Sequence, residues 1–345
     1  MTPLSPLPIP SFFEADRVGA IWRVPYQSLA SQAKDWAAQY SITAAAEDNR
    51  RLCLVLIDVQ NTFCIPDFEL FVAGRSGRGA VEDNIRLCQF IYGNLGQITT
   101  IVSTLDTHTA MQVFHAEFWI DPAGANPLPM TLIHYNDVVQ GKWLVNPAIS
   151  PSLDDYSYHQ LQEYALHYTK TLDDRGKYPL TIWPYHSMLG GIGHALVPAI
   201  EEACFFHALA RHSQTRFELK GSHPLTENYS VLSPEVTQDN TGRAIAQPNT
   251  ALIQFLLDFD AVIIAGQAKS HCVAWTVADL LAAIQTQDPS LAQKIYLLED
   301  CTSPVVVPGV VDFTEQANDI FQEFAAAGMH IVQSTQPLPD WPGLG

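Results

Sequence analysis

One cysteine occupies a position where a thiol could act as a nucleophile. In the stretch "AGQAKSHCVAWTVADL", Cys272 follows an apolar run and precedes a pattern with helical spacing. At the start of a helix, free backbone N–H groups and the positive end of the helix dipole face the sulfur. Because this setting lowers a thiol pKa and favours the thiolate, it predicts a reactive cysteine. Taken alone, a lone cysteine is more commonly a buried structural residue.

A second group of residues offers ligands for a metal ion. In "STLDTH", Asp106 and His108 are two residues apart, so both side chains point the same way from an extended segment. A carboxylate and an imidazole on one side suit a metal with mixed oxygen and nitrogen ligands. His186 in "WPYHSMLGGIGHAL" could complete a set of two histidines and one carboxylate. The short pattern recurs by chance, so it does not establish a site by itself.

Two further charged residues have ordinary as well as catalytic interpretations. Asp58 ends an apolar run in "LIDVQNTF", where an aspartate most often caps a helix or forms a turn. Lys220 in "FELKGSHPLTENYS" is, on its own, most often a solvated charge. Neither residue indicates chemistry until it is considered with the other motifs.

Apolar runs alternate with helical patterns, and this order indicates how the candidate residues are positioned. The predicted strands are 51–60, 98–108, 261–268, 294–300 and 329–334, and the predicted helices are 26–42, 80–97, 194–209, 271–286 and 312–328. Such alternation predicts a three-layer α/β/α fold with a mainly parallel central sheet covered by helices on both faces. Sheets of this kind bind ligands at the carboxyl ends of their strands, so the site is expected there.

The domain organisation is predicted as one elaborated domain. Residues 1–50 form an N-terminal extension, and residues 51–345 form the α/β domain. The region 116–182, rich in Pro, Tyr, Asp and His, fits the alternation poorly and is interpreted as a long insertion. Structureless loops of this length are unusual inside compact domains unless they are functional, so a lid is one interpretation.

Composition narrows the class of protein and its partners. With 18 Lys+Arg against 36 Asp+Glu, the net charge of -18 disfavours nucleic acid and anionic membranes as partners. The six cysteines form no CxxC pair, which favours free thiols over disulfides or a zinc finger. No apolar run reaches the roughly 18 residues that span a bilayer, and the N-terminus lacks the pattern of a signal peptide. A cytoplasmic protein is therefore expected.

In chain order, five of these stretches resemble the motifs of the isochorismatase-like cysteine hydrolases, and most closely those of the nicotinamidase branch. "LVLIDVQNTF" resembles the first-strand motif with the catalytic aspartate, and "STLDTH" resembles the metal-binding D-x-H. "WPYHSM" and the glycines after it resemble the segment of the last histidine ligand. "LKGSHPLTENYS" is similar to the motif of the catalytic lysine, and "GQAKSHCVAWTVADL" to the G-x-A-x-x-x-C-V-x-x-T signature of the nucleophile. The resemblance covers about residues 50–335 without the insertion and implies the same fold.

The resemblance implies a metal-dependent amidase mechanism. Asp58 would take the proton of the Cys272 thiol, and Lys220 would hold the carboxylate and thiolate together. The thiolate would attack the amide carbonyl of a small substrate, ammonia would leave with a proton from Asp58, and water would cleave the thioester. The backbone N–H groups of Ala268 and Cys272 would hold the oxyanion. Relatives carry a cis peptide before that alanine, here Gln267–Ala268.

A cofactor and an assembly are implied in the same way. Asp106, His108 and His186 would bind a divalent ion, zinc or another, that orients a pyridine nitrogen. Relatives are commonly dimers or larger, which implies a homo-oligomer.

Three other residues keep two interpretations each. His115 and Glu227 are candidates for an additional metal or pocket contact, and each is equally well an ordinary surface side chain. Phe63 is a candidate wall of the ring pocket, and core packing is as good an interpretation.

Rival functions are known on the same scaffold. The same scaffold could carry an ether hydrolase of the isochorismatase type, an amidase for ureido or maleamate-type substrates, or a catalytically idle binding protein. Isochorismatases do not use the cysteine, and most sister amidases lack the metal triad, so the motifs together favour nicotinamidase chemistry. The insertion, and the segment after Phe63, depart from the family pattern and could admit a larger or different amide. No G-x-G-x-x-G follows a predicted strand, which argues against a dinucleotide-binding protein.

Overall fold

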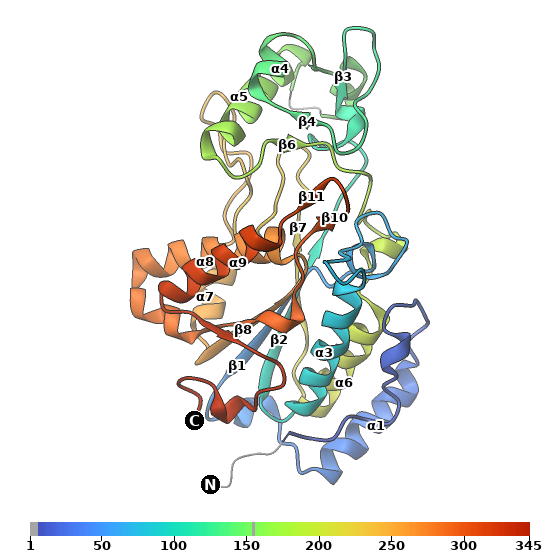
Figure 1. Cartoon of the computed structure of the whole chain (residues 1–345), viewed down its shortest axis with the longest axis vertical. Helices are drawn as coiled ribbons and strands as arrows, with labels where there is room; N and C mark the ends of the chain where they lie inside the picture. The colour runs from blue at the N-terminus through green and yellow to red at the C-terminus, as the bar shows by residue number, and fades with distance from the viewer. Residues whose placement is uncertain (1–5, 154–155) are drawn as a thin grey trace.

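The computed structural model describes residues 6–153 and 156–345 of the chain. The first five residues of the expected extension and two residues of the expected insertion therefore lie outside the description. Figure 1 shows a lower part built on a twisted sheet and an upper lobe that stands beyond one end of its strands.

Six parallel strands form the central sheet in the order β12-β9-β8-β1-β2-β7. Their bounds are Leu52–Ile57 for β1, Ile98–Asp106 for β2, Arg216–Lys220 for β7, Ala261–Gly266 for β8, Ile295–Leu298 for β9 and His330–Val332 for β12. The two central strands β1 and β8 are buried along their whole length, as expected for apolar runs covered on both faces. The predicted parallel sheet is confirmed.

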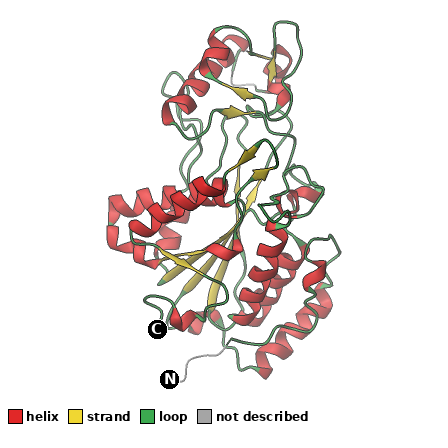
Figure 2. Cartoon of the chain, in the orientation of Figure 1, coloured by secondary structure: helices red, strands yellow, loops and turns green. Residues whose placement is uncertain are grey.

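Helices cover both faces of this sheet (Figure 2). On one face lie α1 (Tyr26–Gln39), α3 (Gly79–Gly93) and α6 (Pro198–Arg211), and on the other lie α7 (Thr250–Leu257), α8 (Ala274–Gln287) and α9 (Thr314–Ala326). Alternate residues of β1 enter the two layers: Leu54 packs in the core cluster with α3 and α6, and Val55 in the cluster with α7, α8 and α9. The three-layer α/β/α architecture is thus the one predicted.

Strand β7 and helix α7, which belong to the three-layer core, had no sequence prediction. Strand β7 lies at the edge of the sheet, and exposed or half-buried residues occupy four of its five positions. Such a strand lacks the continuous apolar run of a buried one. Helix α7 has only eight residues, which is too short for a clear helical period.

The upper lobe is formed by the region expected to be an insertion, and it has its own secondary structure. It contains α4 (Tyr135–Val139), α5 (Tyr158–Arg175) and two small antiparallel pairs, β3 (Trp119–Ile120) with β5 (Leu144–Val145) and β4 (Leu132–Ile133) with β6 (Leu180–Thr181). A separate hydrophobic cluster that includes Trp119, Tyr164 and Tyr168 fills its interior. This region is therefore a packed lobe rather than a structureless loop.

Smaller elements lie near the carboxyl ends of the strands. A one-turn helix α2 (Asn61–Cys64) follows β1, and a hairpin of β10 (Val306–Val307) and β11 (Val311–Asp312) precedes α9. Between β8 and α8 lies a π-helical turn, Lys269–Val273. In the two described ranges, no helix has the length and apolar character needed to cross a membrane.

Candidate active site

Four neighbouring strand ends bring together the three predicted catalytic residues and the predicted metal ligand Asp106. Asp106 is the last residue of β2 and lies in register with Lys220, the last residue of β7. Asp58 follows β1, and Cys272 lies in the π-helical turn after β8. Because β8, β1, β2 and β7 are adjacent, these four side chains meet at one edge of the sheet.

The ammonium group of Lys220 lies between two carboxylates and the thiol. Its Nζ is 2.9 Å from Asp58 Oδ2, 2.9 Å from Asp106 Oδ1 and 3.6 Å from Cys272 Sγ. The same Nζ donates to the backbone carbonyl of Asn228 at 2.9 Å. Since Lys220 is only 4% exposed, solvent screens these contacts little. A cation in this place can hold a carboxylate and a thiolate side by side.

Burial and neighbouring charges set the protonation of these groups. Desolvation alone would lower the pKa of Lys220, but Asp106 and Asp58 outweigh it and raise that pKa well above its usual value. Burial raises the pKa of Asp58, although Lys220 opposes the rise. Burial also raises the pKa of Cys272, again against Lys220. The expected lowering of the thiol pKa is therefore wrong, because loss of solvent around the sulfur outweighs the charge of Lys220. A protonated thiol needs a base, and Asp58 is placed to be one.

Thr104 holds Asp58 in place and was missed in the sequence. The Asp58 N–H donates to Thr104 Oγ1 at 3.0 Å, and the Thr104 hydroxyl donates to Asp58 Oδ1 at 2.5 Å. Asp58 is fully buried and has a φ of 48°, a left-handed conformation that an aspartate tolerates better than most residues. Thr104 lies two residues before Asp106 on the same strand, and this spacing is the signal that could have identified it.

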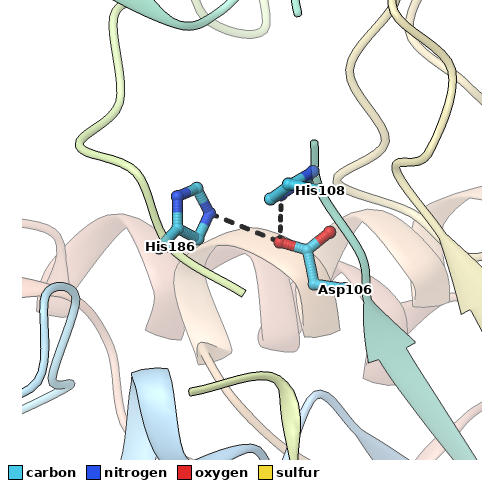
Figure 3. Close-up of side chains that lie close together, drawn as sticks. All are labelled: Asp106, His108 and His186. Carbon is cyan, nitrogen blue, oxygen red and sulfur yellow. Dashed lines mark hydrogen bonds and ion pairs between the residues drawn. The ribbon is translucent and has the colours of Figure 1, made fainter. Parts of the chain in front are cut away.

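Asp106, His108 and His186 form the one cluster of potential metal ligands found in the described part of the chain. Figure 3 shows both imidazoles directed at the same carboxylate oxygen: Nε2 of His108 is 2.8 Å and Nε2 of His186 is 3.4 Å from Asp106 Oδ2. The other nitrogen of each ring orients it through a backbone carbonyl. His108 Nδ1 lies 3.0 Å from the carbonyl oxygen of Gly221, and His186 Nδ1 lies 2.8 Å from that of Pro184. Outer contacts of this type are typical of histidine ligands. The donor set therefore fits a divalent cation.

Gly221 permits the close approach of the chain to this cluster. Its φ is 81°, and a Cβ at this position would lie 2.7 Å from His108 Cε1 and 2.8 Å from Asp106 Oδ1. Only glycine combines this backbone conformation with the space that the two ligands occupy. The glycine directly follows Lys220, so one short segment supplies both the cation and the room for the potential metal ligands.

The structure places His115 beside the cluster but not within its ligand set. Its ring is fully buried, and its centroid is 5.8 Å from that of His108 and 6.3 Å from that of His186. Burial and the two neighbouring histidines lower the pKa of His115 to about 3, so the ring is neutral. The interpretation of His115 as a surface side chain is wrong.

Glu227 also lies outside the ligand set, and it faces the cavity described below. Its Oε1 accepts from Trp183 Nε1 at 3.1 Å and its Oε2 from the Tyr168 hydroxyl at 3.0 Å. Burial, together with Glu235, raises its pKa to about 8, against these hydrogen bonds. Tyr168 comes from the insertion and Trp183 directly follows it, and both are distant from Glu227 along the chain, which explains why the sequence could not identify them. Glu227 is a buried pocket residue rather than a surface one.

The two clusters line one cavity of about 540 Å³. Cys272, Lys220 and Ala268 lie in its lining together with the three potential ligands, whereas Asp58 does not. Phe63 is also part of the lining, and its ring lies edge-on to that of His186 at 5.8 Å. The peptide bond Gln267–Ala268 is cis. Of the six cysteines, all of which are described, only Cys272 is partly exposed.

Comparisons with known proteins point to one group of enzymes. No family model matches the sequence. A nicotinamidase of Escherichia coli (strain K12) is 28% identical over 169 residues, which are 47% of this chain and 61% of that protein. The match thus spans less than two thirds of the relative's length.

Solved structures with detectable likeness have low sequence identity. The yeast nicotinamidase Pnc1p bound to the inhibitor nicotinaldehyde is 17% identical, with 82% of this chain and 99% of that chain covered and a TM-score of 0.49. A pyrazinamidase of Pyrococcus horikoshii in complex with zinc is 18% identical, with 82% and 98% covered and a TM-score of 0.42.

The sequence match is to the same branch of enzymes whose motifs the chain resembles. It confirms the resemblance to the nicotinamidase branch of the isochorismatase-like hydrolases: the chain is similar to a nicotinamidase.

Proposed function

We propose that this chain is a metal-dependent cysteine amidohydrolase, and that nicotinamide, hydrolysed to nicotinate and ammonia, is its substrate. The observation that carries the proposal is the contact of one buried ammonium group with both a carboxylate and a thiol. Lys220 Nζ lies 2.9 Å from Asp58 and 3.6 Å from Cys272, beside a cavity that also exposes an Asp/His/His cluster. This arrangement supplies a nucleophile, its base and a counter-charge in one place.

In the acylation step, the buried Asp58 carboxylate accepts the proton of the Cys272 thiol as the substrate carbonyl approaches. The sulfur attacks the carbonyl carbon, and Lys220 balances the negative charge that moves between the two side chains. The backbone N–H groups of Ala268 and Cys272 are the proposed donors to the oxyanion. Collapse of the tetrahedral species breaks the C–N bond, and Asp58 returns the proton to the leaving ammonia.

In the deacylation step, Asp58 acts a second time as a base. It takes a proton from a water molecule that attacks the thioester, and Cys272 leaves as the thiol. The raised pKa of Asp58 suits a group that must accept and release a proton in each half of the reaction.

The Asp106, His108 and His186 cluster is the proposed metal site. Two imidazole nitrogens and a carboxylate suit zinc or a similar divalent ion. When bound, the ion supplies a Lewis acid that can coordinate a ring nitrogen of the substrate. The chain's own contribution is to orient both imidazoles through backbone carbonyls and to keep Asp106 ionised: desolvation opposes its ionisation, but His108 and Lys220 lower its pKa.

The test is ammonia release from nicotinamide by the purified protein, with and without prior chelation. Cys272→Ala should abolish release and leave the thermal unfolding midpoint within a few degrees of wild type. Cys204→Ala removes a buried thiol of α6 outside the cavity and should retain activity. Wild-type rates in Cys272→Ala, or full activity after chelation, would contradict the proposal.

A further inference from the structure

The cavity is larger than a single-ring carboxamide requires. Its volume of about 540 Å³ lies within the roughly 300–1,000 Å³ range of pockets that enclose drug-sized ligands. The proposed catalytic and metal-binding side chains are a minority of its lining residues, and the remainder is free to contact other parts of a substrate.

The buried base indicates which end of the substrate faces inward. Asp58 is 0% exposed and absent from the cavity lining, so it lies beneath the floor formed in part by Lys220 and Cys272. A leaving amine can receive a proton from Asp58 only if its nitrogen points at this floor. A bulky group on that nitrogen would therefore collide with the floor, and the open end of the cavity must hold the acyl part.

The open end of the cavity is apolar and is built from three separate segments. They are the segment after α2, the upper lobe and the β10–β11 hairpin, which contribute Leu70, Phe71, Met130, Val307 and Val310. The last three are 49%, 38% and 78% exposed, and exposed apolar side chains that gather in one place mark ligand-binding surfaces. Apart from the site residues described above, His271 and Tyr229, Glu69 is the one ionisable side chain of the described lining.

We infer that the preferred substrate is a primary carboxamide whose aromatic ring carries a second apolar group, held against Leu70, Phe71, Met130, Val307 and Val310. The inference rests on the proposed function and specifies its substrate class. The chemistry is unchanged: the C–S bond forms as the C–N bond breaks, ammonia leaves, and water converts the thioester into the acid and the free thiol. Desolvation of the second group against the apolar rim supplies the additional binding.

Isomeric amides test this directly. The kcat/KM of nicotinamide is compared with those of 5-phenylnicotinamide, 6-phenylnicotinamide and N-phenylnicotinamide, in which the same extra ring is on the leaving amine. At least one ring-substituted amide should exceed nicotinamide by about tenfold, a ratio typical of filling an apolar pocket. N-phenylnicotinamide should be slowest, although aniline is the better leaving group.

The outcomes separate the two proposals. Hydrolysis of nicotinamide at a rate equal to or above that of both ring-substituted amides would overturn the inference and leave the proposed function intact. Faster turnover of N-phenylnicotinamide would overturn the predicted orientation and the inference with it. No hydrolysis of any of the four amides would reject the proposed function, and the inference would fall with it.

A matched pair of variants locates the contact. Val310→Asp places a charge at the hairpin tip and should lower kcat/KM for the preferred phenyl amide about tenfold more than for nicotinamide. Val139→Asp makes the same change at a 55% exposed position of α4 outside the cavity lining, and both substrates should be hydrolysed as by wild type. An equal effect of Val310→Asp on the two substrates would overturn the assignment of the rim.

Discussion

The hydroxyl of Thr104 tunes the proposed base and gives a prediction on pH dependence. The proposed reaction needs Asp58 as a carboxylate, and burial raises its pKa above the ordinary 3.8, whereas the Thr104 hydrogen bond lowers it. Activity is therefore lost as the pH falls through this raised pKa. Thr104→Val removes the lowering contribution, so the acidic limb of kcat/KM should move to higher pH. Thr169→Val, which alters a buried threonine of α5, is the control, and an unmoved limb in Thr104→Val would contradict the assignment.

Gly221 and Gly242 provide a matched pair for the metal site. Their φ values are 81° and 84°, but a Cβ on Gly221 would meet His108 and Asp106, whereas one on Gly242 would meet nothing within 4 Å. Both alanine variants pay the strain of a left-handed residue, on the order of 1 kcal/mol. Only Gly221→Ala should also lose bound metal, as measured by elemental analysis of the purified proteins. Equal metal content in the two variants would show that the close approach does not matter.

Helix α5 contacts the loop after β7, and Glu227 is buried at this contact. The free energy of unfolding therefore depends on pH through Glu227. Tyr168 of α5 donates to Glu227, and Tyr164 donates to the carbonyl of Leu225. Burial raises the Glu227 pKa from 4.5 to about 8, so the folded state binds this proton more tightly than the unfolded state. The protonated Glu227 therefore stabilises the folded state fully below the ordinary pKa of 4.5, and this stabilisation is lost as the pH rises to about 8.

Glu227→Gln should remove that dependence because it mimics the protonated acid. The free energy of unfolding of wild type should fall relative to the variant between about pH 4.5 and pH 8. Each unit of pKa shift corresponds to about 1.4 kcal/mol, so the difference is a few kcal/mol at most. Denaturant titrations at several pH values measure it, with the surface variant Glu163→Gln as control. Parallel curves for wild type and Glu227→Gln would contradict the raised pKa.

An element could be predicted from the sequence when burial in the core gives it a long apolar pattern. The buried strands β1 and β8 and the helices α3, α6 and α8 have long apolar signals, and the sequence predicted them. The edge strand β7 and the two-residue strands of the upper lobe have no such signal, since most of their order comes from contacts distant in sequence.

The same distinction applies to the site. Asp58, Asp106 and Cys272 could be brought together from the sequence because parallel strands end at a common edge. The direction of the pKa shift of the Cys272 thiol could not be predicted from the sequence, since it depends on how deeply the completed fold buries the sulfur. The partners of Glu227 were also out of reach, because Tyr168 and Trp183 lie 59 and 44 residues away along the chain.

For the molecule as a whole, a bound ion would connect the upper lobe to the sheet. Asp106 and His108 are at the end of β2, whereas His186 follows β6, the last strand of the lobe. A ligand that binds only the folded state stabilises it by about 2.7 kcal/mol at a hundredfold excess over its Kd. Chelation should therefore lower the unfolding temperature of wild type by several degrees.

Before chelation, the His108→Ala variant should already unfold at the lower temperature expected of chelated wild type. Chelation should not lower its unfolding temperature further. His159→Ala, at a position whose side chain is 84% exposed, should behave as wild type. A chelation-insensitive unfolding temperature in wild type would exclude a tightly bound structural ion.

The homo-oligomer, the cytoplasmic location and the division into extension, domain and insertion stay predictions. Sedimentation equilibrium tests the homo-oligomer.

The three segments that form the rim of the cavity have a consequence for how such a protein can evolve. Leu70, Met130 and Val310 lie on a loop, a lobe and a hairpin, and the four strand ends that carry the proposed chemistry contain none of them. Substitutions, insertions or deletions in these segments can alter selectivity while the sheet keeps the reacting groups in register. Proteins that descend from one ancestral catalyst can thus acquire different substrates by changes in these three segments alone. Directed evolution can use the same approach, with mutant libraries confined to the three segments.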